Sequence, residues 1–129
     1  MEKIVETCNE NRQYTREDLE EILDMLPYQI WLKDSEGKHI YMNKLFAESV
    51  GLSKDEIIGK TDFEIRDSDS AKQCIATDEI LSDKDSHMYI EEHVNVENKD
   101  IFFRVNKFKL SRDNNREDII GGISEEISL

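Results

Sequence analysis

The chain has 129 residues, which is the size of a single domain. Thirty acidic residues against seventeen basic residues give a net charge of −13, which disfavours binding to nucleic acid or to an anionic membrane surface. No apolar run reaches the roughly 20 residues of a membrane span, and the first ten residues do not resemble a signal peptide. The two cysteines, Cys8 and Cys74, do not form a disulfide framework, so we expect a cytoplasmic protein.

The first predicted element is an amphipathic helix over residues 15–26. Thr15 followed by Asp18 is typical of a capping box, and Pro27 ends the helix. Its apolar side chains recur at helical spacing, at Leu19, Ile22, Leu23 and Leu26. We therefore divide the chain into an N-terminal tail and helix, residues 1–26, and a domain over residues 27–129.

A β-hairpin is predicted next. Residues 28–33 and 38–42 are rich in strand-forming side chains, and the sequence DSEG between them is typical of a turn. Asn43 then provides an N-cap for a helix that ends at Gly51.

Three further helical segments are expected in the middle of the chain. Ser53 with Glu56 forms a second capping box before a short helical turn, and Asp62 is placed to cap another. A longer helix runs from Ser68 to about Ser82. Its apolar positions are Ala71, Cys74, Ile75 and Leu81.

The C-terminal third reads as three strands. Residues 88–96, 101–110 and 118–127 are separated by segments with the composition of hairpin turns. Strands at both ends of the chain with helices between them predict an α+β fold with an antiparallel sheet.

At this point the residues resemble the PAS sensor-domain family. The turn DSEG, Asn43, GLSKDEIIGK and TDFE occur in that family's order and spacing. DIIGGISEEIS is similar to the family's last strand, with Glu126, Ile127 and Ser128 in place of its closing Asp-Ile-Thr. The resemblance covers about residues 24–128. It implies a five-stranded antiparallel sheet in the order 2-1-5-4-3, with short helices closing a cavity over one face. The amphipathic helix precedes this domain in the sequence.

The resemblance also implies a function. Similar domains are sensory modules that bind a small ligand or rearrange as dimers, and that relay the change to a covalently linked output domain. That domain is typically part of a histidine kinase or a diguanylate cyclase, so the chain looks like an excised fragment. A ligand-free dimerisation and relay module is the alternative. The predicted first helix either closes its own core or forms the dimer interface through Leu19, Ile22, Leu23 and Leu26.

Known cofactors of similar domains are disfavoured. Haem-binding relatives supply a histidine from the long helix, and residues 68–82 contain none. The histidines His39, His87 and His93 are expected to be ordinary surface residues. Flavin-binding relatives carry an Asn-Cys-Arg-Phe-type motif where this chain has TDFEIRDSD, without a cysteine. No ligand is therefore identified, and no metal site is predicted because no HxxxH or CxxC spacing occurs.

Two carboxylates interrupt apolar patterns. Asp78 lies on the apolar stripe of the long helix, and Glu92 shares a strand face with apolar residues. A buried carboxylate needs a partner, so we expect a salt bridge to Arg104 or Lys107, or a helix position that reaches solvent. Alternatively, the two carboxylates line a polar end of the cavity and select a ligand.

A third and less favoured function, after the two sensory modules, is an enzyme that uses Asp78 or Glu92 as a base, because no third catalytic group accompanies them. No catalytic residue is predicted, and Cys74 is expected to pack as a small hydrophobe. The inward face of residues 101–110 is left open. The apolar pocket candidates are Ile30, Leu32, Ile40, Met42, Phe46, Ile58, Phe63, Ile75 and Phe103.

Overall fold

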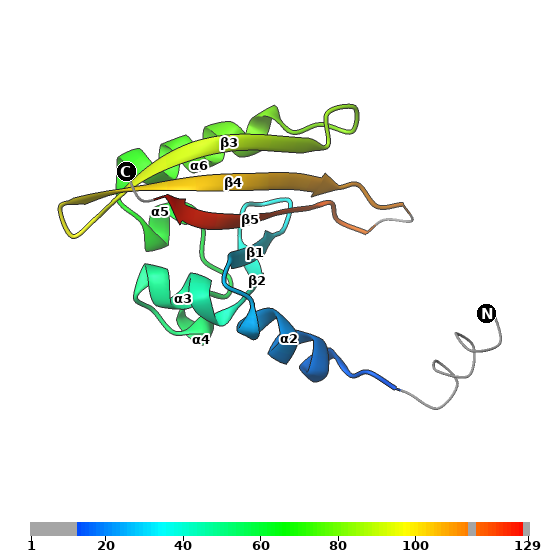
Figure 1. Ribbon diagram of the computed structural model, residues 1–129. Helices are drawn as coiled ribbons and strands as arrows, with labels where there is room; N and C mark the ends of the chain where they lie inside the picture. Colours follow the sequence, from blue (N-terminus) through cyan, green and yellow to red (C-terminus); the bar gives the residue numbers. More distant parts are fainter. Residues whose placement is uncertain (1–12, 114–115, 128–129) are drawn as a thin grey trace.

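A computed structural model describes residues 13–113 and 116–127 (Figure 1). Its five strands form one antiparallel sheet in the order β2-β1-β5-β4-β3. The strands are β1 Gln29–Lys33, β2 His39–Met42, β3 His87–Val96, β4 Lys99–Leu110 and β5 Ile119–Ile127. The helices are α2 Arg16–Met25, α3 Lys44–Val50, α4 Lys54–Ile57, α5 Asp62–Ile65 and α6 Ser68–Ile80. The predicted fold class and strand order are confirmed.

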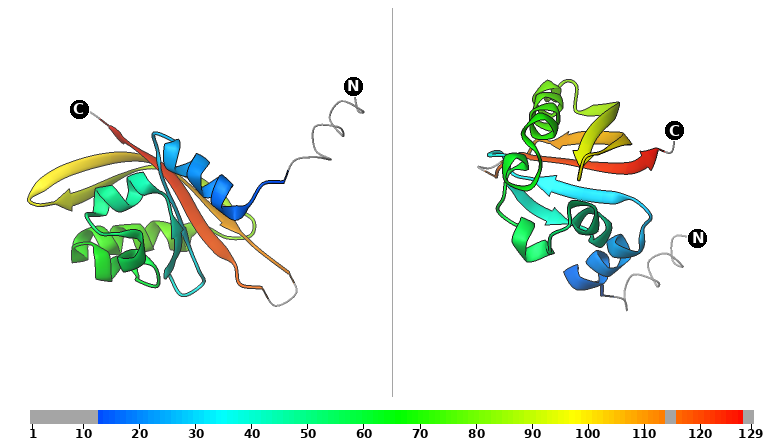
Figure 2. Two further views of the ribbon diagram at one scale, coloured as in Figure 1. Left: turned by 90° about the horizontal axis from the view of Figure 1, so that it is seen from below. Right: turned by 90° about the vertical axis from the view of Figure 1, so that its left-hand side faces the viewer.

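The helices are divided between the two faces of the sheet. Helices α3 to α6 lie over one face, called the inner face below, whereas α2 lies on the other side (Figure 2). The hydrophobic core fills the space between the sheet and the helical layer. Its buried members are Trp31, Met42, Phe46, Ala47, Ile57, Phe103 and Val105.

Asn43 joins three elements through its side chain. Its Oδ1 accepts hydrogen bonds from the backbone N–H of Phe46, at 3.2 Å, and of Ile30, at 3.0 Å. Its Nδ2 donates to the carbonyl oxygens of Leu23 and Tyr28. The predicted N-cap of α3 is confirmed, and the same residue attaches the end of α2 to the sheet.

The two capping boxes predicted at Thr15 and Ser53 are both present. The third cap differs from the prediction. Thr61, rather than Asp62, precedes α5, and Glu64 accepts hydrogen bonds from the backbone N–H and hydroxyl of Thr61. Asp62 does not cap the helix because its carboxylate points into the interior and binds Lys33 there.

The pairing of β4 settles which face each of its side chains occupies. Phe103, Val105 and Lys107 are buried on the inner face. Phe102 and Phe108 alternate with them on the opposite, outer face. Phe108 and Leu32 both approach the Cα of Gly121 in β5, which has no side chain to displace them.

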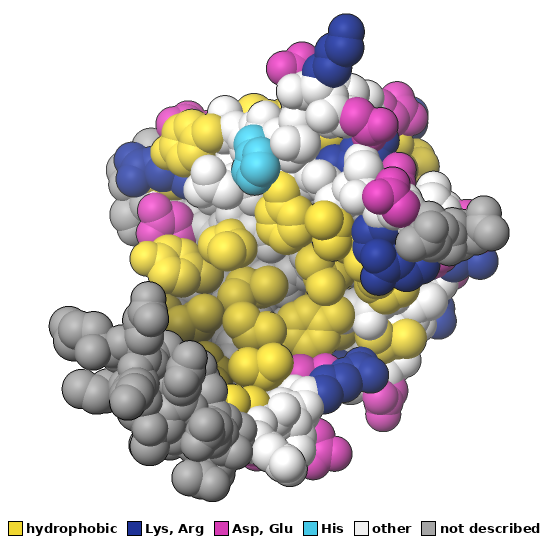
Figure 3. Space-filling view, turned by 90° about the vertical axis from the view of Figure 1, so that its right-hand side faces the viewer, with side chains coloured by type: hydrophobic (Ala, Val, Ile, Leu, Met, Phe, Trp, Pro, Cys, Tyr) yellow, Lys and Arg dark blue, Asp and Glu magenta, His cyan; other side chains and the backbone are white. Residues whose placement is uncertain are grey.

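The outer face of the sheet is largely apolar. Directly paired residues of antiparallel strands share a face, so the register identifies its members. A row of charged side chains, Glu91, Arg104 and Glu125, also lies on this face. Its apolar members are Ile30, Leu32, Tyr41, Tyr89, Phe102, Phe108, Leu110, Ile119, Ile123 and Ile127. A broad patch of hydrophobic side chains is visible on this side of the molecule (Figure 3). We call these ten residues the outer apolar face.

Candidate functional site: a buried ion network

Two lysines enter the interior from the inner face of the sheet. Lys33 ends β1, where it alternates with Gln29 and Trp31, and Lys107 lies in the middle of β4. Both side chains are almost completely buried. A buried ammonium group is costly unless charged and hydrogen-bonding partners surround it, and both lysines have such partners.

Lys107 is held by four groups from α6 and β3. Its Nζ lies 2.8 Å from Asp78 Oδ1 and 2.8 Å from Glu92 Oε1. It also donates to the Thr77 hydroxyl at 2.7 Å and to the Cys74 carbonyl at 3.1 Å. The Thr77 hydroxyl in turn donates to Glu92 at 2.9 Å. Of the two cations expected as partners of Asp78 and Glu92, Lys107 binds both, whereas Arg104 lies beside Glu125 instead.

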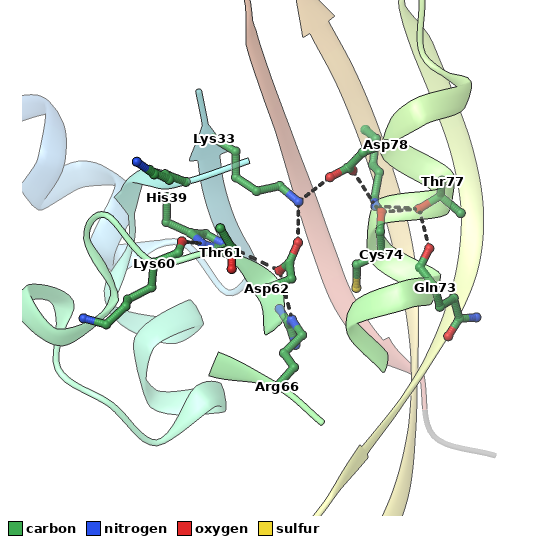
Figure 4. Close-up of polar contacts among 12 residues, drawn as sticks. Lys33, His39, Lys60, Thr61, Asp62, Arg66, Gln73, Cys74, Thr77 and Asp78 are labelled. Carbon is green, nitrogen blue, oxygen red and sulfur yellow. Dashed lines mark hydrogen bonds and ion pairs between the residues drawn. The ribbon is translucent and has the colours of Figure 1, made fainter. Parts of the chain in front are cut away.

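Lys33 joins the same network from the other side. Its Nζ donates to Asp62 Oδ2 at 2.7 Å and also to Asp78 (Figure 4). Asp78 therefore lies between the two lysines, because its other oxygen binds Lys107. Arg66 Nε donates to the other oxygen of Asp62, Oδ1, at 3.3 Å. His39 lies beside that same oxygen, with Nε2 at 3.7 Å. The network thus links β1, β2, β3, β4, α5 and α6.

The charges of the network balance when His39 is neutral. Three cations, Lys33, Lys107 and Arg66, face three carboxylates, Asp62, Asp78 and Glu92. Burial would lower the pKa of Lys33, but Asp62 and Asp78 outweigh it and hold that pKa above its ordinary value. Burial likewise opposes ionisation of Asp62, yet Lys33 and Arg66 hold its pKa below the ordinary range. These directions indicate that both groups are charged at neutral pH.

The network leaves little free space. The cavity that it borders, between Trp31, Phe103 and Lys107, has a volume of about 20 Å³. A polar cavity of that size holds one water molecule. A wider groove of about 380 Å³ opens at the end of β1 and reaches Lys33, Asp62 and Asp78 from outside.

Comparison with known proteins adds a family to this geometry. A family model described as the PAS fold matches residues 10–128. The chain belongs to the PAS family. PAS domains are generally non-catalytic sensory modules of signal-transduction proteins. No curated protein matches the chain.

Solved structures share the fold at low sequence identity. The PAS domain of a Colwellia psychrerythraea protein is 15% identical, with a TM-score of 0.70 over 86% of this chain and 95% of that one. The PAS domain of Bordetella pertussis BvgS is 16% identical, with a TM-score of 0.68 over 88% and 86%. The Vibrio cholerae VqmA dimer is 17% identical, with a TM-score of 0.74 over 90% of this chain and 52% of that one.

The structure distributes the predicted pocket residues of this PAS domain over several places. Glu92 and Phe103 border the small cavity, whereas Phe63, Ile75 and Asp78 border the groove. Met42 and Phe46 belong to the core. Ile40 and Ile58 are exposed, and Ile30 and Leu32 lie on the outer face. This differs from the expected placement because β1 turns Trp31 and Lys33 toward the cavity.

Four titratable members of the network were predicted neither as site residues nor as ion-pair partners of them: Lys33, His39, Asp62 and Arg66. His39 was expected at the surface, and this was wrong, since its side chain is 1% exposed. Its Nδ1 binds the Lys60 carbonyl at 2.7 Å and its ring packs against Phe46. The alternation of Trp31 with Lys33 in β1 was the available signal for Lys33.

Within the described ranges, no group of three His, Cys, Asp or Glu side chains is arranged to hold a metal ion. Among the same residues, no helix is long and apolar enough to cross a membrane. Cys74 is buried against the network, with its thiol 3.7 Å from Glu92 Oε2. Cys8 and the first part of the predicted N-terminal tail lie outside the described residues, as does Ser128.

Proposed function

We propose that this PAS domain is a sensory relay module that works as a homodimer, paired through α2 and the outer apolar face. In this proposal, rearrangement of the dimer is passed along β5 to a linked output domain. The observation that carries it is the pair of partly exposed apolar surfaces, one on α2 and one on the sheet.

No residue of helix α2 is fully buried, and of its apolar stripe only Leu23 is half-buried against the rest of the described chain. Leu19 and Ile22 are each 53% exposed, and Leu26 is also exposed. The helix is attached through its C-terminal end, where Lys54 pairs with Asp24 at 2.9 Å. An apolar stripe left open in this way supports the dimer-interface reading of the helix over closure of its own core.

The outer apolar face supports the same proposal. It extends over all five strands, and Tyr89, Leu110 and Ile123 are exposed within it. Large exposed apolar patches mark interaction surfaces. A second copy would cover this face with its own α2 and would bury both surfaces together. VqmA of Vibrio cholerae, which shares this fold, is a dimer.

The filled interior supports relay without a ligand. An apolar ligand would have to separate Lys33 and Lys107 from their carboxylates, and unpaired buried charges are strongly unfavourable. Ligand binding remains the second candidate because the groove of about 380 Å³ offers apolar walls from Phe63, Ile75 and Ile120. VqmA has also been solved with a ligand and DNA.

The output domain would follow β5, which lies in the middle of the sheet between β1 and β4. The outer residues of β5, including Ile123, belong to the proposed interface, so a change there reaches the strand directly. A PAS domain from a two-component sensor histidine kinase has the same fold, with a TM-score of 0.59 at 8% identity. This favours a histidine kinase as the output domain in our proposal, and a diguanylate cyclase is the alternative. We also propose a cytoplasmic location, because the thiol of Cys74 is free and thiols stay reduced in the cytoplasm.

The interface is tested by a matched pair of variants. Ile22→Glu places a charge on the stripe of α2, and Ile80→Glu makes the same change on α6, where the side chain is 64% exposed on the helical layer. We expect the wild type and Ile80→Glu to be dimers by sedimentation velocity, and Ile22→Glu to be a monomer. A monomeric wild type contradicts the proposed interface. So does a dimer that survives in the double variant Ile22→Glu with Ile123→Glu, which places a charge on both proposed surfaces.

A further inference from the structure

Both ring nitrogens of His39 face hydrogen-bond acceptors. Nδ1 lies 2.7 Å from the Lys60 carbonyl oxygen, which can only accept, so Nδ1 carries a proton. Nε2 points toward Asp62 Oδ1 at 3.7 Å and has no hydrogen-bond partner among the described residues. A neutral imidazole therefore turns a lone pair toward a buried carboxylate. Only the doubly protonated imidazolium could donate to both oxygens.

The same carboxylate oxygen is already bound by Arg66. Its Nε donates to Asp62 Oδ1 at 3.3 Å, while Lys33 uses the other oxygen. Arg66 and His39 also share the ring of Phe46, from which the guanidinium carbon lies 5.5 Å. The two side chains thus lie on either side of one acceptor, Asp62 Oδ1 (Figure 4).

A proton on His39 would disturb the charge balance of the network. The six charges around it sum to zero, so the imidazolium adds one uncompensated positive charge in a buried region. The most accessible cation is Arg66, whose side chain is 18% exposed, against 3% for Lys33 and 1% for Lys107. Arg66 can therefore leave toward solvent at the lowest cost.

We propose that His39 is a proton-binding switch, in which the imidazolium takes Asp62 Oδ1 and displaces Arg66 from the network. Arg66 directly precedes Asp67, the N-cap of α6, so its release loosens the joint between α5 and α6. The remaining members keep their partners, because Lys33 still binds Asp62 and Asp78.

The groups that surround His39 set the pH at which the switch operates. Burial lowers the pKa of His39 from 6.5, Asp62 and the Lys60 carbonyl oppose this, and Lys33 and Arg66 add to it. The switch therefore responds to acidification below about pH 6.5. Departure of Arg66 removes one of the charges that oppose protonation, so proton uptake and release of Arg66 favour one another. For a sensory module the proton would be an input signal, and in that respect the inference rests on the proposed function.

The experiment is a pH titration by nuclear magnetic resonance, from about pH 7.5 to about pH 4.5. It follows the His39 ring, the Nε–H of Arg66 and the backbone amides of α6. We expect Arg66 and the first turn of α6 to shift with the same midpoint as His39, below 6.5. The variant His39→Asn retains a donor near the Nδ1 position and cannot titrate, so the Arg66 shift should disappear. The control His93→Asn removes an exposed histidine paired with Asp100, and the Arg66 shift should remain.

Three results would overturn the proposal. They are a His39 that stays neutral across the range, an Arg66 signal that does not move as His39 titrates, and a shift that persists in His39→Asn. The wild-type titration decides the matter even if His39→Asn does not fold. Because the titration concerns one copy of the chain, repeating it with Ile22→Glu separates the switch from the proposed dimer.

Discussion

Replacing Lys107 with methionine tests how strongly the ion network stabilises the fold. Lys107→Met keeps the apolar stem of the side chain but removes the ammonium group that binds Asp78, Glu92, Thr77 and the Cys74 carbonyl. Asp78 retains Lys33, whereas Glu92 keeps only the Thr77 hydroxyl and the thiol of Cys74 as partners. The variant therefore leaves one buried carboxylate without a cation.

Breaking a buried ion pair by removing one partner costs about 3–5 kcal/mol. Domains are stable by only about 5–15 kcal/mol, so the loss is a large part of the total. With a urea m-value of about 1–3 kcal/mol per molar, the unfolding midpoint should fall by roughly 2 M. Equilibrium urea unfolding followed by circular dichroism measures this shift. The m-value should stay unchanged, because the same surface is exposed on unfolding.

Lys109→Met is the matched control on the same strand. Lys109 is more exposed than Lys107, and its partners Asp83 and Asp118 lie 3.4 and 3.7 Å away. Such surface pairs contribute about 0–1 kcal/mol, so the control should unfold close to the wild type. If Lys107→Met costs no more than Lys109→Met, the network does not stabilise the fold as we reason. Adding Glu92→Gln to Lys107→Met should recover part of the loss, because it removes the unpaired charge.

Two further predictions concern Cys74 and acid stability. Burial raises the pKa of Cys74 to about 12, so the thiol of the folded chain should not react with iodoacetamide at about pH 8. In a Cys8→Ser background the chain should react only once it is unfolded in urea, and alkylation of the native chain at the rate of a free thiol would contradict this. Stability should also depend on pH through His39 and Asp62, whose pKa values are both lowered. The unfolded chain takes up the His39 proton first, so the free energy of unfolding should fall as pH drops below 6.5, and should fall further below 3.8 as Asp62 is protonated. Urea unfolding at a series of pH values measures both, and a decline below 6.5 that is unchanged in His39→Asn would contradict the assignment to His39.

The helices, strands and turns could be predicted from the sequence because the decisive signals are local, whereas the strand order was implied by the resemblance to the PAS family. Thr15, Asn43 and Ser53 cap helices where their side chains predict caps, and Gly51 ends α3 with a φ of 81°. The turn of Glu97 and Asn98 joins β3 to β4 with positive φ at both residues. Each of these features depends only on residues a few positions away, so it can be predicted from the local sequence.

The candidate site was only partly predictable. Asp78 and Glu92 were identified because a carboxylate interrupts an apolar pattern, and the need for a buried cation narrowed their partner to Arg104 or Lys107. Lys33 and its partner Asp78 are 45 residues apart, and nothing local indicates that pairing. Both faces of β1 carry apolar side chains, so hydrophobicity favoured Ile30 and Leu32 as the cavity side, whereas the structure turns Trp31 and Lys33 toward the cavity.

The central claim is a dimeric relay module whose interior is filled by its own charges. Native mass spectrometry of the purified chain, compared with its denatured mass, tests both parts at once. The account predicts a dimer at twice the 15.2 kDa chain mass, with no additional mass lost on denaturation. A monomer would contradict the proposed interface. A small molecule that stays bound to the native chain and is lost on denaturation would contradict the filled interior and would favour ligand binding instead.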